Sequence, residues 1–409
     1  MTIACRFCGA ALRHTFADLG MSPLANSYLK PEQLEAMEPF YPLHVRVCSE
    51  CLLVQLPEFE SPEHIFSDYA YFSSVSESWL KHCEAYAAGM TARFGLGKDA
   101  LVAEVASNDG YLLQYFARAG VPVLGIEPAA NVAKVAVAKG VPTEVAFFGV
   151  KTAERLAGQG RRADLIAANN VLAHVPDIND FVRGFATLVK PEGVVTVEFP
   201  HLLNLIEQNQ FDTIYHEHCS YLSFGVVERI YAKHGLRVFD VDRVPTHGGS
   251  LRVYACPAGA RHAETASVAA MRGLERDAGL HSLEAHTRAQ ERLVALKCDV
   301  MNFFATARRE GKRIAGYGAP AKGNTLLNFC GIGPELMPFT VDLSPHKQGL
   351  YLPGTHIPIR HPDEIARAKP DYVFILPWNL REEITGQMKH VRDWGGRFVV
   401  PIPQVRELP

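Results

Sequence analysis

The stretch LVAEVASNDG at residues 101–110 decides the fold, because an apolar run leads directly into a polar turn with a single glycine. Such a run is typical of a buried parallel strand. The pattern repeats along the chain: strands are expected at 121–127, 163–170 and 193–198, with helices over 111–119 and 131–139. Strands that alternate with helices predict a doubly wound α/β sheet that binds its ligand at the carboxyl ends of the strands.

The turn after the first strand indicates the kind of ligand. A dinucleotide-binding turn would show G-x-G-x-x-G, whereas this one has Gly110 alone. Glu104 and Glu127, 23 residues apart, each lie in or at the end of a hydrophobic strand. S-adenosylmethionine (SAM) has no pyrophosphate, and carboxylates can hold its ammonium group and its ribose diol. The alternative is that Glu104 caps a strand and Glu127 is a solvated loop acid.

We expect the SAM site to use polar residues of this turn and of the ends of the next two strands. They are Glu104, Ser107, Asn108, Asp109, Gly110, Glu127, Pro128, Asn169 and Asn170.

Two C-x-x-C pairs, Cys5/Cys8 and Cys48/Cys51, open the chain. Two such turns supply four thiolates, which close a tetrahedral shell and predict a structural Zn²⁺ rather than a catalytic one, which needs an open position. A redox motif and two disulfides are the alternatives. A redox C-x-x-C is expected within a βαβ pattern, which is absent here, and disulfides are rare in a cytosolic chain. The loop of residues 9–47 is long enough to require structure of its own.

Composition limits the classes of function. The chain has 409 residues, a net charge of −3, 48% apolar and 21% charged residues. This is ordinary globular composition, enough for two or three domains. The charge balance argues against nucleic-acid binding. No signal peptide and no apolar run of transmembrane length is present, so a cytoplasmic protein without a membrane partner is expected.

A second α/β unit is predicted at the C-terminal end. A long helix over 282–310 precedes strands at 313–318, 338–342, 372–376 and 397–400, which indicates a partial Rossmann-like domain. We divide the chain into a zinc-binding domain (1–57), a helical connector (58–98), a SAM-binding domain (99–281) and a C-terminal α/β domain (282–409).

Residues 211–221 contain a candidate catalytic cluster. H-E-H is not the H-E-x-x-H metal motif, but His218 has a side chain whose ordinary pKa of ~6.5 suits a general base. Glu217 can orient such a base, and Tyr215 can donate to an oxyanion. A polar surface turn is the alternative. His174 is a second candidate, with a capping or core histidine as the alternative.

The ordered motifs resemble the zinc-containing, SAM-dependent C-methyltransferases of nucleotide-linked deoxysugars, such as the TDP-sugar C3-methyltransferases of antibiotic pathways. The resemblance covers essentially the whole chain. It rests on the paired C-x-x-C, Y-x-Y-x-S-S at 69–74, E-x-x-S-N-D-G at 104–110, N-N-x-L-x-H at 169–174, Y-H-E-H at 215–218, H-G-G-S-x-R at 247–252, G-Y-G-x-x-A-K-x-N at 316–324, and Asp342 with Lys347.

The resemblance implies a class I SAM-methyltransferase fold and assigns roles to individual residues. His218 would be the base, Tyr215 would bind the sugar or its enolate, Glu217 would orient neighbouring groups, and Tyr71 and His174 would lie at the sugar. The implied substrate-binding residues are His247, Gly249, Ser250, Arg252, Tyr317, Lys322 and Asn324.

The expected reaction is C-methylation at C3 of a TDP- or GDP-linked 4-keto-6-deoxysugar through an enolate, in antibiotic or polysaccharide biosynthesis. Three alternatives stay open: a nucleic-acid methyltransferase with a zinc ribbon, a non-catalytic binding module, and an NAD-dependent oxidoreductase that uses Gly316–Lys322. A monomer is expected.

Overall fold

The computed structural model describes residues 3–60, 73–75 and 77–409. Their contacts define two compact units, each built from separate stretches of chain. The first unit comprises Met1–Leu12, Cys48–His201 and Cys219–His281, and the second comprises Arg13–Val47, Leu202–His218 and Ser282–Pro409. Contact-based units of this kind do not test the domain boundaries drawn from the sequence, which stay predictions.

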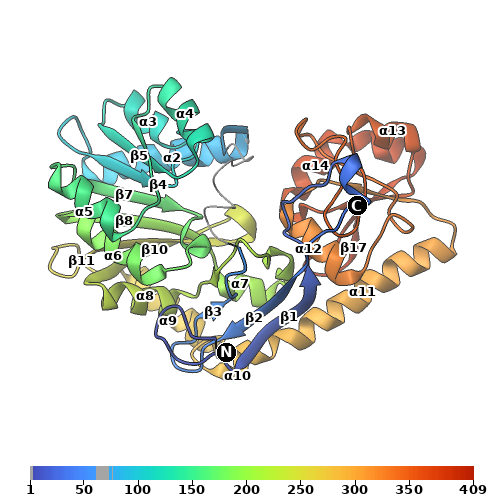
Figure 1. The fold of residues 1–409 in the computed structure, drawn as a ribbon, viewed down its shortest axis with the longest axis horizontal. Helices are drawn as coiled ribbons and strands as arrows, with labels where there is room; N and C mark the ends of the chain where they lie inside the picture. Colours follow the sequence, from blue (N-terminus) through green and yellow to red (C-terminus); the bar gives the residue numbers. More distant parts are fainter. Residues whose placement is uncertain (1–2, 61–72, 76) are drawn as a thin grey trace. The chain divides into compact units, whose positions relative to one another are not determined.

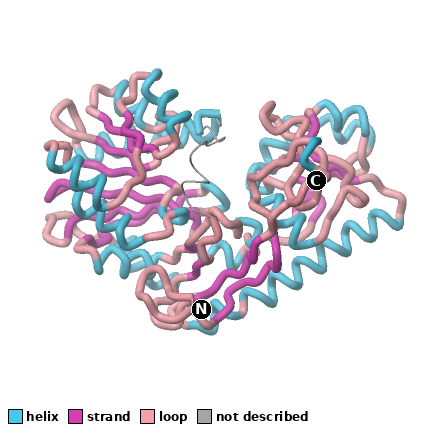
Figure 2. The backbone as a smooth tube through the Cα atoms, in the orientation of Figure 1, coloured by secondary structure: helices cyan, strands magenta, loops and turns pink. Residues whose placement is uncertain are grey.

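The first unit is built on a seven-stranded sheet in the order β10-β11-β8-β7-β4-β5-β6 (Figure 1). The central strands pair in parallel, and β11 is antiparallel to both neighbours. Helices lie on either side of this sheet (Figure 2). The strands are β4 (Val102–Val105), β5 (Val123–Glu127), β6 (Thr143–Val145), β7 (Ala163–Asn169), β8 (Val189–Pro200), β10 (Leu236–Val244) and β11 (Ser250–Pro257).

The four strands predicted from the sequence are confirmed, as are the helices α3 and α4. The α-helices of this unit are α2 (Glu77–Phe94), α3 (Leu113–Arg118), α4 (Ala130–Ala138), α5 (Val150–Gly158), α6 (Ile178–Leu188), α8 (Phe224–Lys233) and α9 (Ala266–Asp277). Short 3-10 turns are η2 (Ser73–Val75), η3 (Leu172–His174) and η5 (Thr246–Gly248), and β3 (Val54–Gln55) pairs with β9 (Ser220–Tyr221).

Local chemistry explains where these helices begin. The carboxylate of Asp177 accepts the backbone N–H of Asp180 at 2.9 Å and caps α6. The hydroxyl of Ser223 accepts from the amide of Val226 and caps α8. Each cap satisfies an amide that the first helical turn leaves without an intrahelical partner.

The second unit has a six-stranded sheet in the order β14-β13-β12-β15-β16-β17, parallel except for β17. This order matches a doubly wound sheet, so the predicted Rossmann-like unit is confirmed. Its strands are β12 (Ile314–Tyr317), β13 (Thr340–Val341), β14 (Ile359–Arg360), β15 (Tyr372–Ile375), β16 (Arg397–Val400) and β17 (Arg406–Leu408). Its other elements are β1 (His14–Ser22), η1 (Pro31–Gln33), β2 (Tyr41–Val47), α7 (Leu202–Glu207), η4 (Phe211–Thr213), α10 (Leu283–Thr287), α11 (Ala289–Arg309), α12 (Ala321–Cys330), α13 (Asp363–Ala368), η6 (Trp378–Leu380), α14 (Arg381–Gln387) and η7 (Lys389–Trp394).

The expected single helix over 282–310 is wrong at its start. The structure has α10 and α11, separated at Arg288, whose ψ of −11° departs from the helical value of about −42°. The long helix α11 runs beside the antiparallel β1–β2 hairpin (Figure 1). Among the described helices, none has both the length and the low polarity needed to cross a bilayer.

The loop between the two C-x-x-C pairs carries structure of its own, as predicted. It forms β1, η1 and β2 and belongs to the second unit, although the cysteines at both of its ends belong to the first.

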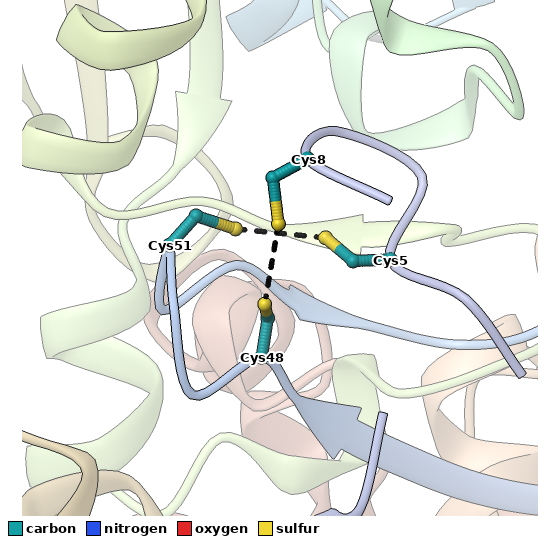
Figure 3. A group of neighbouring side chains, drawn as sticks. All are labelled: Cys5, Cys8, Cys48 and Cys51. Carbon is teal, nitrogen blue, oxygen red and sulfur yellow. Dashed lines mark hydrogen bonds between the residues drawn. The ribbon is translucent and has the colours of Figure 1, made fainter. Parts of the chain in front are cut away.

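The four cysteine thiols converge on one point (Figure 3). Their sulfur atoms all lie within 4.8 Å of one another, and the Cys5–Cys51 and Cys8–Cys48 pairs are both 3.5 Å apart. Four sulfurs at ~2.3 Å from a tetrahedral Zn²⁺ would be separated by about 3.8 Å, so the cluster fits zinc. The side-chain amide of Gln55 donates to the sulfur of Cys5 at 3.1 Å and so supports a thiolate there. Four protein ligands leave no open position for a substrate.

Replacing one zinc ligand should destabilise the first unit. We expect Cys48→Ser to lose bound zinc and to lower the midpoint of thermal unfolding by at least ~5 °C, since ~2 kcal/mol shifts a domain of this size by that order. Metal analysis and a thermal melt measure both effects. Cys298→Ser, at an exposed cysteine outside the cluster, is the control. Unchanged zinc content in Cys48→Ser would contradict the assignment.

Candidate active site

The turn after β4 is strained and carries three polar residues, Ser107, Asn108 and Asp109. Ala106, Asn108 and Gly110 all have positive φ, at 55°, 48° and 77°. Positive φ is unfavourable for non-glycine residues, and such strain gathers at functional sites. The turn also lies close to β5, because a Cβ atom at Gly125 would come within 2.5 Å of the Ser107 hydroxyl. Only glycine at position 125 permits this approach.

Glu127 fixes this turn from the end of β5. Its two carboxylate oxygens accept the backbone N–H groups of Asn108 and Ala129 at 2.8 and 2.9 Å. Burial raises the pKa of Glu127, and these two amides oppose the rise. Glu127 is therefore not a solvated loop acid. Pro128, which follows it, is half-buried.

Glu104 lies fully buried on β4. Burial raises the pKa of this carboxyl well above its ordinary value, and the nearby hydroxyl of Tyr111 opposes the rise. Neither carboxylate oxygen has a hydrogen bond of ordinary length within the described part of the chain. Such a group costs free energy unless a ligand supplies the missing donors.

Several other buried polar atoms at this edge of the sheet share that property. Among described residues, no hydrogen-bond partner is found for Ser107 Oγ, Asp109 Oδ1, Asn169 Oδ1 and Nδ2, or Asn170 Oδ1. The other oxygen of Asp109 pairs with Lys139 at 3.0 Å. Buried carboxylates beside amide and hydroxyl groups suit a ligand that carries an ammonium group, a carboxylate and a ribose. The residues present therefore fit SAM.

A buried charge cluster lies on the neighbouring strands. Arg252 on β11 donates to the carboxylate of Glu198 on β8 at 2.6 Å, and His82 from α2 contacts the same carboxylate at 3.0 Å. Arg252 was predicted to contact substrate; the structure pairs it internally, and a substrate contact stays a prediction. The sequence analysis missed Glu198 and His82. Glu198 could have been found from the sequence, because it ends the strand predicted at 193–198 just as Glu127 ends the strand predicted at 121–127.

The other predicted sugar-site residues of the first unit lie near strand ends, in the 3-10 turns η3 and η5 and at the start of β11. The backbone carbonyl of His174 accepts from the thiol of Cys219. His247 has a φ of 54°, and its ring centroid lies 5.6 Å from that of Trp79. Gly249 and Ser250 bind the carbonyl of Thr246 through an amide and a hydroxyl. Tyr71 lies outside the described residues.

The candidate base lies in the second unit with a defined tautomer. The Nδ1 atom of His218 lies 2.7 Å from the backbone carbonyl of Thr213. A carbonyl can only accept, so Nδ1 carries the hydrogen and Nε2 is the nitrogen that can take a proton. The ring centroid of Tyr215 lies 4.0 Å from that of His218. The sequence cluster therefore forms a spatial cluster.

Glu217 is held by a residue that the sequence analysis missed. Its carboxylate accepts a hydrogen bond from the side-chain amide of Asn26 at 2.6 Å. Burial raises the pKa of Glu217, and this bond opposes the rise. Asn26 comes from the loop between β1 and β2, 191 residues earlier in the chain, and no local pattern marks it.

The predicted substrate residues at the start of the C-terminal unit have partners within the unit. Lys322 donates to the side-chain carbonyl of Asn379 at 2.8 Å, and the side-chain amide of Asn324 donates to the backbone carbonyl of Ala25 at 2.6 Å. Tyr317 donates to the side chain of Gln387 at 3.3 Å. Their predicted contacts with a nucleotide stay predictions.

The glycine turn after β12 is also satisfied internally. The carboxylate of Asp342 accepts the backbone N–H of Ala319 at 2.7 Å. The backbone carbonyl of Ala319 accepts from Lys347 at 2.8 Å and from the hydroxyl of Tyr28 at 2.5 Å. In a dinucleotide-binding unit an acid at the end of the next strand, here β13, would hold a ribose hydroxyl. Because Asp342 binds the turn itself, the geometry weighs against the NAD-dependent interpretation.

Three family models match the chain: a zinc binding domain over residues 5–66, a methyltransferase domain over 79–241, and a C-methyltransferase C-terminal domain over 245–403. The C-methyltransferase NovU of Streptomyces niveus is 38% identical over 404 residues, which cover 99% of this chain and 96% of NovU.

Two further matches are partial. A ubiquinone biosynthesis O-methyltransferase of Bartonella tribocorum is 30% identical over 97 residues, 24% of this chain and 39% of that protein. The crystal structure of magnesium protoporphyrin IX methyltransferase from Synechocystis with bound SAM aligns with a TM-score of 0.33 and 16% identity, over 43% of this chain and 78% of that one.

Glu127 should be necessary for SAM affinity. In Glu127→Gln an amide nitrogen would face a backbone N–H donor, so one of two charge-assisted bonds is lost and the turn shifts. Such bonds contribute ~1.5–3 kcal/mol, so the Kd for SAM should rise about 10–100-fold in a calorimetric titration.

Glu144→Gln is the matched control, because that acid lies on the next strand and pairs with Arg155 and Arg161 instead. A thermal melt shows whether each variant is folded. A folded Glu127→Gln protein with unchanged SAM affinity would contradict the role.

Proposed function

The chain belongs to the SAM-dependent C-methyltransferases, and from that premise we propose that it methylates C3 of a nucleotide-linked 4-keto-6-deoxysugar. The family membership confirms the resemblance seen in the motifs and excludes the non-catalytic interpretation. The observation that carries the choice of substrate class is the cluster of Tyr215, Glu217 and His218, with the tautomer of His218 set by Thr213.

Carbon methylation needs a carbon nucleophile, and a base must create it. A 4-keto group acidifies the hydrogen on the adjacent C3, so a histidine can remove it as a general base. In our proposal Nε2 of His218 takes this proton, and Nδ1 remains bonded to the Thr213 carbonyl throughout. The imidazolium that forms keeps its orientation because that bond persists.

Removal of the proton leaves negative charge on the C4 oxygen, which a hydrogen-bond donor must stabilise. The phenol of Tyr215 is our candidate donor, because its ring packs against the His218 ring. Glu217, bound to Asn26, anchors the same segment. When bound, SAM supplies an electrophilic methyl group, so no further activation of the donor is required of the protein.

The proposal assigns roles to residues of each unit. The first unit would contribute Glu104, Asn169 and His174 on the cofactor side. Lys322 and Asn324 of the second unit are our candidates for contacts with the nucleotide. TDP and GDP carriers both remain within the proposal.

A direct test is to incubate the purified protein with SAM and a panel of TDP- and GDP-linked 4-keto-6-deoxysugars, with and without a 2-hydroxyl. We expect one sugar to gain the mass of a CH₂ group in step with S-adenosylhomocysteine formation. If no 4-keto sugar is methylated while a nucleic acid or another carbon acid is, the substrate class is wrong.

The base can be tested separately from methyl transfer. With S-adenosylhomocysteine in D₂O, the wild-type protein should exchange the C3 hydrogen of its substrate for deuterium, and His218→Asn should not. Turnover with SAM should fall ~10²–10⁴-fold, as expected for loss of general base catalysis, with the Kd for SAM unchanged.

His281→Asn, at an exposed histidine outside the cluster, is the matched control. Full exchange in His218→Asn would assign the base to another residue.

A further inference from the structure

A buried acid near the candidate base has no role in the reaction described so far. Asp212, in η4, has no exposed surface. Its carboxylate accepts the indole N–H of Trp378 at 2.7 Å, and the second oxygen has no hydrogen bond of ordinary length among the described residues. Burial raises the pKa of Asp212 to about 6, and the ammonium of Lys322 opposes the rise. A buried carboxylate of this kind needs a structural or functional reason.

The position of Asp212 relative to the base is specific. The residue after it, Thr213, provides the carbonyl that accepts from Nδ1 of His218. The residue after that, Ile214, has its carbonyl bound by the hydroxyl of Thr325 at 2.9 Å. Two residues of the C-terminal segment therefore bind the residues on both sides of Thr213: Trp378 binds the Asp212 side chain, and Thr325 binds the Ile214 carbonyl.

Anchoring alone does not require a charge. An asparagine at position 212 could accept the same indole N–H through its side-chain oxygen. An asparagine would also avoid the desolvation penalty of a buried charged carboxylate. What a carboxylate adds is a stronger, charge-assisted bond, and therefore a tighter constraint on the peptide that follows.

We propose that Asp212, held by Trp378, is a positioning residue that fixes the Thr213 carbonyl and through it the tautomer and orientation of His218. This inference rests on the proposed function, because it gives His218 the role of base. It adds two residues from distant parts of the chain to the machinery that supports that base. Neither belongs to the motifs on which the resemblance rests.

The closest test compares two conservative variants, Asp212→Asn and Trp378→Phe. Each should reduce kcat and the rate of C3 hydrogen exchange about 10–100-fold. The Kd for SAM should stay unchanged, because neither residue belongs to the SAM site. Asp393→Asn, at an exposed aspartate of the same unit, and Trp394→Phe, whose indole N–H binds Pro370 instead, are the matched controls.

A readout independent of turnover separates this inference from the proposed function. In protein labelled with ¹⁵N-histidine, and with His218→Asn for assignment, wild-type His218 should show hydrogen on Nδ1 alone near neutral pH. Asp212→Asn and Trp378→Phe should show a mixture of tautomers. If no sugar is methylated but the tautomers shift in this way, the positioning holds and the substrate is wrong.

Stability provides the check against simple misfolding. The raised pKa means that ionised Asp212 destabilises the folded state, and that this effect declines as the pH falls from about 6 towards the ordinary aspartate pKa of 3.8. Asp212→Asn should therefore match or exceed the wild-type melting temperature at pH 8, with a smaller difference at pH 5. A stable Asp212→Asn protein with unchanged kcat and a single His218 tautomer would overturn the proposal.

Discussion

A carboxylate that is buried away from water must accept hydrogen bonds from the protein or from a ligand. Each unit contains buried carboxylates that are subject to this requirement. Glu127 and Glu217 find donors inside the chain, in two backbone amides and in Asn26. Asp212 finds Trp378. Glu104 finds no donor at ordinary distance among the described residues. The bonds of the first three fix the turn after β4 and the segment 211–218, while a role for Glu104 at the cofactor stays a prediction.

Much of the first unit was predictable because its signals are local. An apolar run, a polar turn and an acid at a strand end lie within a few residues of one another, so the strands β4, β5, β7 and β8 and the cofactor turn follow from the sequence. The paired C-x-x-C works in the same way, since each turn sets two ligands by its own geometry. The strands β10 and β11 were not anticipated, because their alternation of charged and apolar residues is weak.

The support of the candidate base was not predictable. Asn26 and Trp378 reach the segment 211–218 from opposite ends of the sequence, and each bond depends on tertiary structure alone. Arg252 shows the reverse difficulty. The motif H-G-G-S-x-R suggested that Arg252 contacts the substrate, whereas Arg252 pairs with the buried carboxylate of Glu198 on the adjacent strand. Sequence motifs therefore locate the reacting groups more readily than the groups that orient them.

The interleaving of the two units also limits how such enzymes can be recombined. The zinc ligands belong to one unit, but the loop that they enclose contributes β1, β2 and Asn26 to the other. An exchange of the N-terminal domain between relatives would carry a foreign Asn26 loop into contact with a native Glu217 segment. Functional chimaeras should therefore transfer residues 13–47, 202–218 and 282–409 together, which a cut at any single point in the chain cannot do.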